Sequence, residues 1–342
     1  MTEVQAKPLI PGLDENAPLL EVDDLQVEFH TRDGVAKAVN GVSFQLSEGQ
    51  TRAIVGESGS GKSVTAQAIM GILEMPPAKI AGGGITYRGV DLLNIAPEVH
   101  RRIRANHIAM VFQDALSALN PVWTVGFQLG ELFRVHRGMS RKDARRRAVE
   151  LLDLVKIPAA AQRVNEYPHQ FSGGMRQRVM IAMALALDPE VLIADEPTTA
   201  LDVTVQAQIM RLLAEIQAER RMGLILITHD LGVVADVADD ITVMYAGRAV
   251  EQAGVLETFA SPAHPYTKAL LRSIPRLDVK GQRLEVIAGL PPVLTDIPVG
   301  CSFNPRCGNV QDRCRTERPE LATVTPGHAS ACHYAKEVMN GE

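Results

Sequence analysis

The stretch GESGSGKS, residues 56–63, decides the fold of this chain. It follows the apolar run Ala53–Val55 and precedes a helix-like segment over residues 64–70. A strand, a glycine-rich turn and a helix in this order predict a P-loop, which cradles phosphate groups. The glycines let consecutive backbone N–H groups face an anion, and the positive end of the helix dipole favours negative charge at the same place.

The residues expected to hold the nucleotide come directly from this loop. Lys62 reaches the β- and γ-phosphates in such a motif, and the Ser63 hydroxyl lies on Mg²⁺. The alternative is a glycine-rich turn with a chance lysine, and the flanking strand and helix argue against it. The expected nucleotide contacts are Gly56, Glu57, Ser58, Gly59, Ser60, Gly61, Lys62, Ser63 and Val64. The sequence therefore predicts a nucleoside triphosphate as ligand.

Composition sets the broad class of protein. The 342 residues are 46% hydrophobic and 22% charged, as in an ordinary globular protein of one large and one smaller domain. A net charge of −5 argues against a general nucleic-acid binder. We find neither a run of about 18 apolar residues nor a basic region followed by an apolar core, so we expect no membrane span and no signal peptide. Residues 1–18 are expected to form a flexible leader in an intracellular protein.

The folded part is expected to begin near Leu19. The apolar pattern over residues 20–29 predicts a strand that ends in a turn at residues 31–34, and residues 39–44 predict a second strand. The glycine-rich residues 81–84 predict a loop before a strand resumes at residue 85. Phe29 either stacks on adenine, as an aromatic side chain upstream of a P-loop can do, or belongs to the strand core.

Two further motifs predict contacts with the phosphates. Gln113 follows the apolar run at residues 108–112, and a glutamine at the carboxyl end of a strand can touch both Mg²⁺ and an attacking water. A surface turn is the alternative for Gln113. Ser172-Gly173-Gly174 opens a helical pattern, which predicts either a second anion-binding helix N-terminus or a plain serine N-cap.

An acidic pair follows a third buried strand. Residues 191–194 are apolar and lead into Asp195 and Glu196. An acidic pair at a strand end after a P-loop predicts a Walker B motif, with Asp195 on Mg²⁺ and Glu196 aimed at water. The apolar residues 224–227 lead through Thr228 to His229, and a single histidine at such a place is usually structural.

Together these motifs resemble the ABC-type ATPases over roughly residues 19–262. The six motifs stand in the family's order: GESGSGKS, the glutamine of VFQD, FSGGMRQR, LIADEP, TALD and the histidine of ITHD. The resemblance implies an α/β fold with a RecA-like P-loop ATPase core over residues 19–260, including a helical subdomain near residues 96–170. It also implies a head-to-tail dimer, in which each ATP lies between one P-loop and the partner's signature motif.

The same resemblance implies roles for individual residues. Ser172 and Gly174, with Gly173 between them, would contact the γ-phosphate bound on the other subunit. Glu196 would polarise the attacking water, His229 would hold the γ-phosphate of its own site, and Gln113 would assist both Mg²⁺ and water. Asp202 would link the two sites across the interface. Catalysis would rest mainly on charge stabilisation and positioning.

The signature departs from the usual LSGGQ of the family. Phe171 and Met175 stand at its two ends, so a polar side chain is lost at Met175 while the anion-binding centre is intact. FSGGMRQR is more similar to the variant in peptide-importer ATPases, which often work as unlike pairs. The segment SPAHPYTKALL, residues 261–271, resembles the C-terminal extension of dipeptide and oligopeptide importer ATPases. In it we expect Pro265 to start a helix that Leu270 and Leu271 pack in place.

All four cysteines lie in residues 261–342, which we expect to form a small C-terminal domain. They are Cys301, Cys307, Cys314 and Cys332, separated by five, six and seventeen residues. An even set in the tail of an intracellular protein argues against structural disulfides. Four thiolates suit a 4Fe-4S cluster or a tetrahedral zinc, and free buried cysteines are a third possibility. The spacing is similar to the tail of peptide-importer ATPases that hold a 4Fe-4S cluster.

The sequence thus predicts the ATP-hydrolysing subunit of an importer for di- or oligopeptides, peripheral on the cytoplasmic side of the cell membrane. Its expected partners are a second ATPase subunit, of a different chain, two transmembrane permease subunits and an extracytoplasmic binding protein, and no nucleic acid. Residues 119–123 are the expected socket for a permease helix. The alternatives are a related importer ATPase for nickel, glutathione or haem, a soluble ABC ATPase of DNA repair or translation, and a non-catalytic regulatory cassette.

Overall fold

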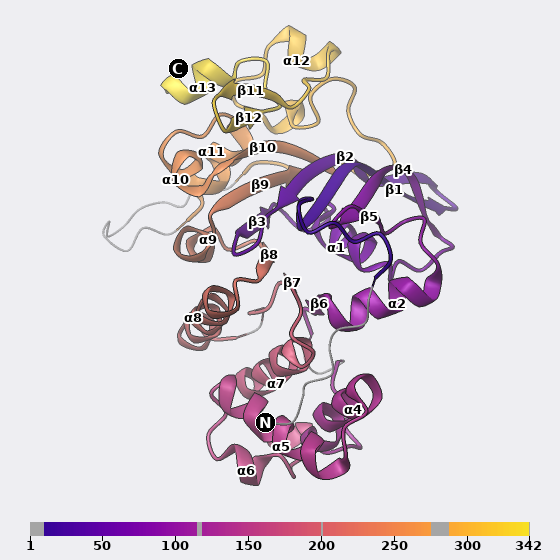
Figure 1. The fold of residues 1–342 in the computed structure, drawn as a ribbon. Helices are drawn as coiled ribbons and strands as arrows, with labels where there is room; N and C mark the ends of the chain where they lie inside the picture. The colour runs from indigo at the N-terminus through magenta and orange to yellow at the C-terminus, as the bar shows by residue number, and fades with distance from the viewer. Residues whose placement is uncertain (1–9, 115–117, 200, 275–286, 342) are drawn as a thin grey trace.

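The computed structural model describes residues 10–114, 118–199, 201–274 and 287–341. Two sheets organise the chain (Figure 1). The smaller sheet is antiparallel, in the order β2-β1-β4-β5, and its strands are β1 (Leu20–Thr31), β2 (Gly34–Leu46), β4 (Ala78–Tyr87) and β5 (Val90–Asp91). The turn predicted at residues 31–34 joins β1 to β2, because β1 ends at Thr31 and β2 begins at Gly34.

The larger sheet has the order β11-β12-β10-β9-β3-β8-β7-β6. Its strands are β3 (Thr51–Val55), β6 (Ile108–Val111), β7 (Val191–Asp195), β8 (Gly223–Thr228), β9 (Asp240–Tyr245), β10 (Arg248–Gly254), β11 (Ala322–Thr325) and β12 (His328–Ser330). The strands β6, β7, β8, β3 and β9 run parallel. The motifs at residues 56–63, 113, 195–196 and 229 lie at or just after the carboxyl ends of β3, β6, β7 and β8, so they all meet at one edge of the sheet.

Helices gather at the end of the molecule opposite the C-terminal segment (Figure 1). They are α4 (Val125–Arg137), α5 (Arg141–Leu154), α6 (Ala160–Arg163), the short 3₁₀ helix η1 (Pro168–Gln170) and α7 (Gly173–Leu185). The helix α2 (Pro97–Asn106) lies apart from them, and its Ile103 is buried in the core of the smaller sheet. Leu129 on α4, Leu152 on α5 and Ile181 on α7 are fully buried in one cluster. Apolar residues at three- and four-residue steps thus build one core between these helices.

The remaining helices lie along the sheets and in the C-terminal segment. They are α1 (Lys62–Met70), α8 (Val203–Arg220), α9 (Leu231–Val237), α10 (Val255–Ala260), α11 (Pro265–Arg272), the 3₁₀ helix η2 (Asn304–Arg306), α12 (Asp312–Thr316) and α13 (Ala335–Asn340). Pro265 occupies the first turn of α11, and Leu270 and Leu271 pack on a buried cluster, as predicted. Within the described ranges, every helix is too short or too polar to cross a membrane.

The loop predicted at residues 81–84 is wrong, because these residues belong to the continuous strand β4. The pairing of β4 with β1 contains a register shift between Asp23 and Gln26. Gly83 lies beside it with φ +84°, and a Cβ there would lie 2.3 Å from the Asp24 carbonyl oxygen. The glycines therefore permit a bulge within a strand, where the local pattern indicated a break.

The predicted flexible leader covers residues 1–18, of which residues 1–9 lie outside the described part. Ile10 is buried against the core of the smaller sheet. The backbone N–H of Asp14 donates to the carbonyl of Arg88 (2.9 Å). Ile10 and the backbone of Asp14 thus attach this part of the leader to the fold.

The C-terminal segment extends the larger sheet. Strand β12 pairs antiparallel with β10, and Glu251 on β10 is fully buried beneath this junction. His328 Nε2 lies 2.7 Å from Glu251 Oε1, and the backbone N–H groups of Ala263 and His264 donate to the same carboxylate. One buried carboxylate therefore holds the entry to α11 and the last hairpin together.

Candidate active site

Close packing shapes the loop between β3 and α1. Gly56 has φ +151°, and a Cβ there would lie 2.2 Å from the carbonyl oxygen of Met244. Gly61 has φ +103°, and a Cβ there would lie 2.3 Å from the carbonyl oxygen of Ala38. Only glycine fits these two positions, because the backbone is left-handed and the neighbouring strands approach closely. The loop therefore leads directly into α1 with its N–H groups at the carboxyl edge of the sheet.

Lys62 lies inside this loop. Its Nζ donates to the carbonyl oxygens of Gly56 (2.8 Å) and Glu57 (3.0 Å), and its side chain is almost completely buried. Burial lowers the pKa of Lys62, while the nearby carboxylates of Glu196 and Asp195 oppose that shift. The arrangement keeps the Lys62 ammonium group at the centre of a loop of the size that binds a phosphate group.

Two of the residues predicted to hold Mg²⁺, Ser63 at the start of α1 and Asp195 at the end of β7, lie together. The Ser63 hydroxyl donates to Asp195 Oδ1 at 3.0 Å. Burial raises the pKa of Asp195, and the hydrogen bond from Ser63 opposes the shift. Gln113, the third residue predicted on Mg²⁺, lies exposed just after β6. A hydroxyl and a carboxylate at this edge are oxygen donors of the kind that Mg²⁺ prefers.

Three side chains contact the carboxylate of Glu196. Gln113 Nε2 donates to Oε2 at 2.9 Å, Thr199 Oγ1 donates to the same oxygen at 2.9 Å, and His229 Nδ1 lies 3.2 Å from Oε1. Glu196 itself has φ +46°, a conformation that costs a residue with a side chain on the order of 1–3 kcal/mol. Strain of this kind at a polar cluster is typical of a functional site. The sequence pattern missed Thr199, whose only signal was its place three residues after Glu196.

Ser172 and Asp202 begin neighbouring helices. The Ser172 hydroxyl accepts from the backbone N–H of Met175 (3.4 Å) at the start of α7, and Asp202 accepts from that of Val205 (3.0 Å) at the start of α8. A Cβ on Gly174 would lie 2.5 Å from Val205, so the glycine lets the two helices approach. Ser172 is exposed, and its N-cap role within its own chain is thus observed.

Phe29 is half-buried within β1, where it pairs with Ala36 on β2 and Ala78 on β4. It packs against the core of the smaller sheet. Its strand-core role is thus observed, and its stacking on adenine stays a prediction.

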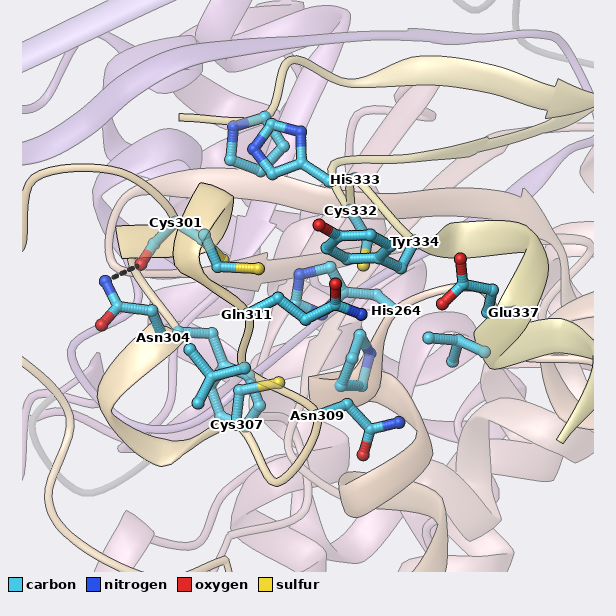
Figure 2. Close-up of a pocket in the computed structure, with 16 residues that line it drawn as sticks. His264, Cys301, Asn304, Cys307, Asn309, Gln311, Cys332, His333, Tyr334 and Glu337 are labelled. Carbon is cyan, nitrogen blue, oxygen red and sulfur yellow. Dashed lines mark hydrogen bonds between the residues drawn. The ribbon is translucent and has the colours of Figure 1, made fainter. Parts of the chain in front are cut away.

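The four cysteines line one cavity of about 340 Å³ in the C-terminal segment. Figure 2 shows the side chains of Cys301, Cys307 and Cys332 around it. Burial raises the pKa of Cys301 to about 11 and that of Cys332 to about 12, and the other thiols of the set add to the shift. Among the described side chains, no three His, Cys, Asp or Glu groups are placed to hold a single metal ion.

Two C-terminal residues that the sequence pattern did not assign to this site reach the P-loop. The Tyr266 hydroxyl accepts from the backbone N–H of Glu57 (2.8 Å), and Arg306 donates to the Glu57 carboxylate. More than 200 residues separate each pair along the chain, so no local pattern signals these contacts.

The chain is similar to known families along most of its length. Residues 39–199 match the ABC transporter family, and residues 250–314 match the C-terminal region of oligopeptide/dipeptide transporters. The dipeptide transport ATP-binding protein DppD of Bacillus subtilis is 51% identical over 92% of this chain and 94% of its own. The oligopeptide transport ATP-binding protein OppD of Salmonella typhimurium is 51% identical over 94% of this chain and 95% of its own.

Solved structures share the fold of the core. An ATP-binding cassette, solved as a dimer in a post-hydrolysis state with ADP and Pi, superposes with a TM-score of 0.62 at 28% identity, over 69% of this chain and 98% of the other. The protein cbiO1 of Clostridium perfringens, part of an ABC transporter complex, superposes with a TM-score of 0.62 at 30% identity, over 72% of this chain and 92% of the other. The RecA-like arrangement of the P-loop core is therefore that of ATP-binding cassettes.

Proposed function

The chain belongs to the family of ABC transporter ATP-binding subunits, and from this premise we propose that it hydrolyses ATP to drive the import of di- or oligopeptides. The peptide assignment rests on sequence identity of 51% to DppD and OppD over more than 90% of their length. It also rests on the match of residues 250–314. The converging side chains at Glu196 support the ATPase role, because a regulatory cassette has no need of them.

The nucleotide would lie on the loop at residues 56–64. Its backbone N–H groups and Lys62 hold the phosphates, which requires Lys62 to exchange its present carbonyl partners for phosphate oxygens. Ser63 and Asp195, already 3.0 Å apart, would hold Mg²⁺ with Gln113 beside them. The cation, when bound, neutralises charge on the β- and γ-phosphates.

Hydrolysis would centre on Glu196. Its carboxylate would accept a hydrogen bond from the attacking water and orient it towards the γ-phosphate. Gln113 and Thr199 donate to one oxygen and keep the carboxylate in place. His229 is largely exposed, with 64% of its side chain accessible, so it remains free to turn towards the γ-phosphate.

A second cassette would complete each site. Ser172, Gly173 and Gly174 lie at the exposed start of α7, where backbone N–H groups and a helix dipole favour an anion. We place the γ-phosphate of the partner subunit there, and Asp202 at the interface between the two sites. A partner encoded by a different chain is favoured by the peptide-importer form of the signature.

The transmembrane partners would dock beside α4. Val122, Trp123 and Phe127 expose 68%, 48% and 40% of their surface, and the rings of Trp123 and Phe127 stack 4.4 Å apart. Leu119 anchors this stretch in the helical core. An exposed apolar group of this size is typical of a protein contact. Two permease subunits and an extracytoplasmic binding protein would place the chain on the cytoplasmic side of the membrane.

The C-terminal segment, residues 261–342, would form a small domain around a 4Fe-4S cluster held by Cys301, Cys307, Cys314 and Cys332. The four thiols surround one cavity, as such a cluster requires. Tetrahedral zinc remains the alternative for the same four thiols. Burial raises the pKa of Cys301, Cys307 and Cys332, so these thiolates would need the positive charge of iron, and the cluster would in turn stabilise the segment.

Reconstitution tests the proposed function. The complex is purified with its co-purifying subunits, placed in vesicles, and supplied with ATP inside and binding protein with labelled peptide outside. We expect peptide-stimulated ATP hydrolysis and uptake that stops when the Glu196→Gln chain replaces the wild type. Uptake of nickel, glutathione or haem without peptide would contradict the peptide assignment, and ATP hydrolysis without any uptake in the assembled complex would contradict the importer.

A further inference from the structure

Arg306 connects the cysteine-bearing segment to the P-loop. Its Nη1 donates to Glu57 Oε2 at 2.6 Å, and its Nη2 donates to Glu57 Oε1 at 2.9 Å. This two-pronged geometry is the strongest form of an arginine–carboxylate pair and fixes both side chains. Glu57 is the second residue of the loop that holds the phosphates, and Arg306 directly precedes Cys307.

The arginine side of this pair is closed off from solvent. Only 4% of the Arg306 side chain is exposed, against 27% for Glu57. Arg306 Nε donates to the carbonyl of Ala288 (3.1 Å), and the guanidinium lies 5.8 Å from the ring centre of Tyr245. The hydrogen bonds to Glu57 hold the pKa of Arg306 above its usual range, so the buried group stays charged. A buried charge that loses its partner is strongly unfavourable, so Arg306 and Glu57 move together.

A second contact fixes the backbone of Glu57. The N–H of Glu57 donates to the hydroxyl of Tyr266 (2.8 Å), and Tyr266 is fully buried among the rings of Tyr245 and Phe303. On its other side, the carbonyl of Glu57 accepts from Lys62 Nζ at 3.0 Å. Glu57 thus stands between the C-terminal segment and the lysine that is proposed to bind phosphate.

The cysteines hold the segment that carries Arg306. The 3₁₀ helix η2 (Asn304–Arg306) begins where Asn304 donates twice to the carbonyl of Cys301, from its backbone at 2.9 Å and its side chain at 2.7 Å. It ends at Cys307, whose N–H donates to the carbonyl of Asn304. Any change in the separation of Cys301 and Cys307 therefore shifts η2, and Arg306 with it.

We propose that Arg306 is a positioning residue of the nucleotide site, which transmits the state of the four-cysteine site to the P-loop through Glu57. This inference rests on the proposed nucleotide role of residues 56–64. When the four cysteines bind their ligand, Arg306 keeps its two hydrogen bonds to Glu57, and the P-loop is preorganised for phosphate. When that ligand is lost, η2 shifts and ATP binds more weakly.

The test compares two arginine variants of the full chain. Arg306→Gln removes the pair at the P-loop, whereas Arg313→Gln removes an exposed Arg–Glu pair in the same segment, Arg313 Nε to Glu317 at 2.8 Å. We expect Arg306→Gln to raise the Kd for ATP in an equilibrium titration by about tenfold, because a charge-assisted hydrogen-bond pair at the loop is lost. Arg313→Gln should leave the Kd unchanged, and Arg306→Lys, which keeps the charge without the fork, should fall between the two.

Double variants measure the coupling of Arg306 to Glu57 and to the cysteines. Glu57→Gln with Arg306→Gln should bind ATP no worse than Arg306→Gln alone, because both changes break one contact. Cys307→Ser should raise the Kd for ATP, and adding Arg306→Gln to it should raise the Kd little further. Full additivity of these pairs would overturn the coupling.

The outcome is distinguishable from failure of the nucleotide site itself. Lys62→Ala is the reference: if it leaves the Kd for ATP unchanged, the proposed nucleotide site fails. If Lys62→Ala weakens binding while Arg306→Gln lowers only the melting temperature, Arg306 is a structural tie and the inference is overturned. If Arg306→Gln does not fold, Arg306→Lys and Glu57→Gln decide the same question in folded protein.

Discussion

Gln113 Nε2 donates to Glu196 Oε2 across 2.9 Å and so joins the carboxyl ends of two neighbouring parallel strands, β6 and β7. Gln113 follows the strand that leads into the helical part, and Glu196 belongs to the acidic pair at the end of β7. A movement of the helical part that carries Gln113 away would therefore remove one of the two donors to Glu196 Oε2 and leave Thr199 on that oxygen. The hydrogen bond is thus a physical connection between the start of the helical part and the candidate catalytic carboxylate.

Replacing the candidate base is the most direct test of hydrolysis. We expect Glu196→Gln to bind ATP normally and to lower turnover by about a hundredfold or more, because the water loses its acceptor. Glu215→Gln, on the exposed face of α8, serves as the control. Turnover is measured in the complex with the other site inactivated. Near-normal turnover of Glu196→Gln there would remove Glu196 from its role.

Lys62 is expected to contribute to binding more than to turnover. Lys62→Ala should raise the Kd for ATP by about tenfold or more, since one charged contact to phosphate is lost. The exposed Lys142→Ala on α5 should have no effect. An unchanged Kd for Lys62→Ala in an equilibrium titration would contradict the P-loop assignment.

Ser172 is expected to act on the partner's nucleotide. Ser172→Ala should leave ATP binding by the isolated chain intact and should impair dimer closure and hydrolysis in the complex. Ser140→Ala is a matched control, because Ser140 caps α5 through Asp143 as Ser172 caps α7, without a predicted phosphate. Each cap loss costs about 1 kcal/mol of stability. Equal loss of ATP binding by the Ser172→Ala monomer would mean that the helix serves its own chain.

The cysteine site predicts a coloured protein. Anaerobically purified chain should be brown and contain iron and sulfide, and Cys307→Ser should bleach it and loosen the C-terminal segment. A colourless protein with one zinc per chain would identify the zinc alternative. Four freely titratable thiols without any metal would remove the site.

Acid should destabilise the fold through His264. Burial lowers the pKa of His264 from 6.5 to about 4, and its Nδ1 accepts from the N–H of Tyr266, which requires an unprotonated nitrogen. The unfolded chain therefore binds more protons between these two values, so stability falls as the pH drops from about 6.5 towards 4, by about 3 kcal/mol in all.

The difference between variants isolates that contribution. His264→Asn keeps an N-cap acceptor and should flatten the pH dependence of the melting temperature in this window. His30→Gln, which removes a half-exposed histidine, should leave the pH dependence of the melting temperature as in the wild type. A pH profile of His264→Asn that runs parallel to the wild type would show that His264 does not titrate on unfolding.

Local pattern predicted the motifs and the strands that carry them. Gln113, Asp195 and His229 were placed correctly at strand ends, because buried runs and their polar termini are visible in sequence. The glycines at residues 82–84 were misread, since a bulge in a strand and a break between strands use the same residue.

Contacts between distant segments were beyond local pattern. Arg306 on Glu57 and His328 on Glu251 are pairs whose partners lie 249 and 77 residues apart. Each residue alone looks like an ordinary charged or polar side chain. Only the topology, which returns the C-terminal segment to the far edge of the larger sheet, brings the partners together.

The pairing of β12 with β10 also has a consequence for how the chain behaves among its own copies. Removing residues after 321 would uncover β10, a seven-residue strand with unpaired N–H and C=O groups, and would leave Glu251 buried without His328. In the intact chain the outermost strand is β11, which has four residues and is largely exposed. A short edge strand of this kind is a poor template for strand addition, so the tail limits edge-to-edge association between copies of the chain.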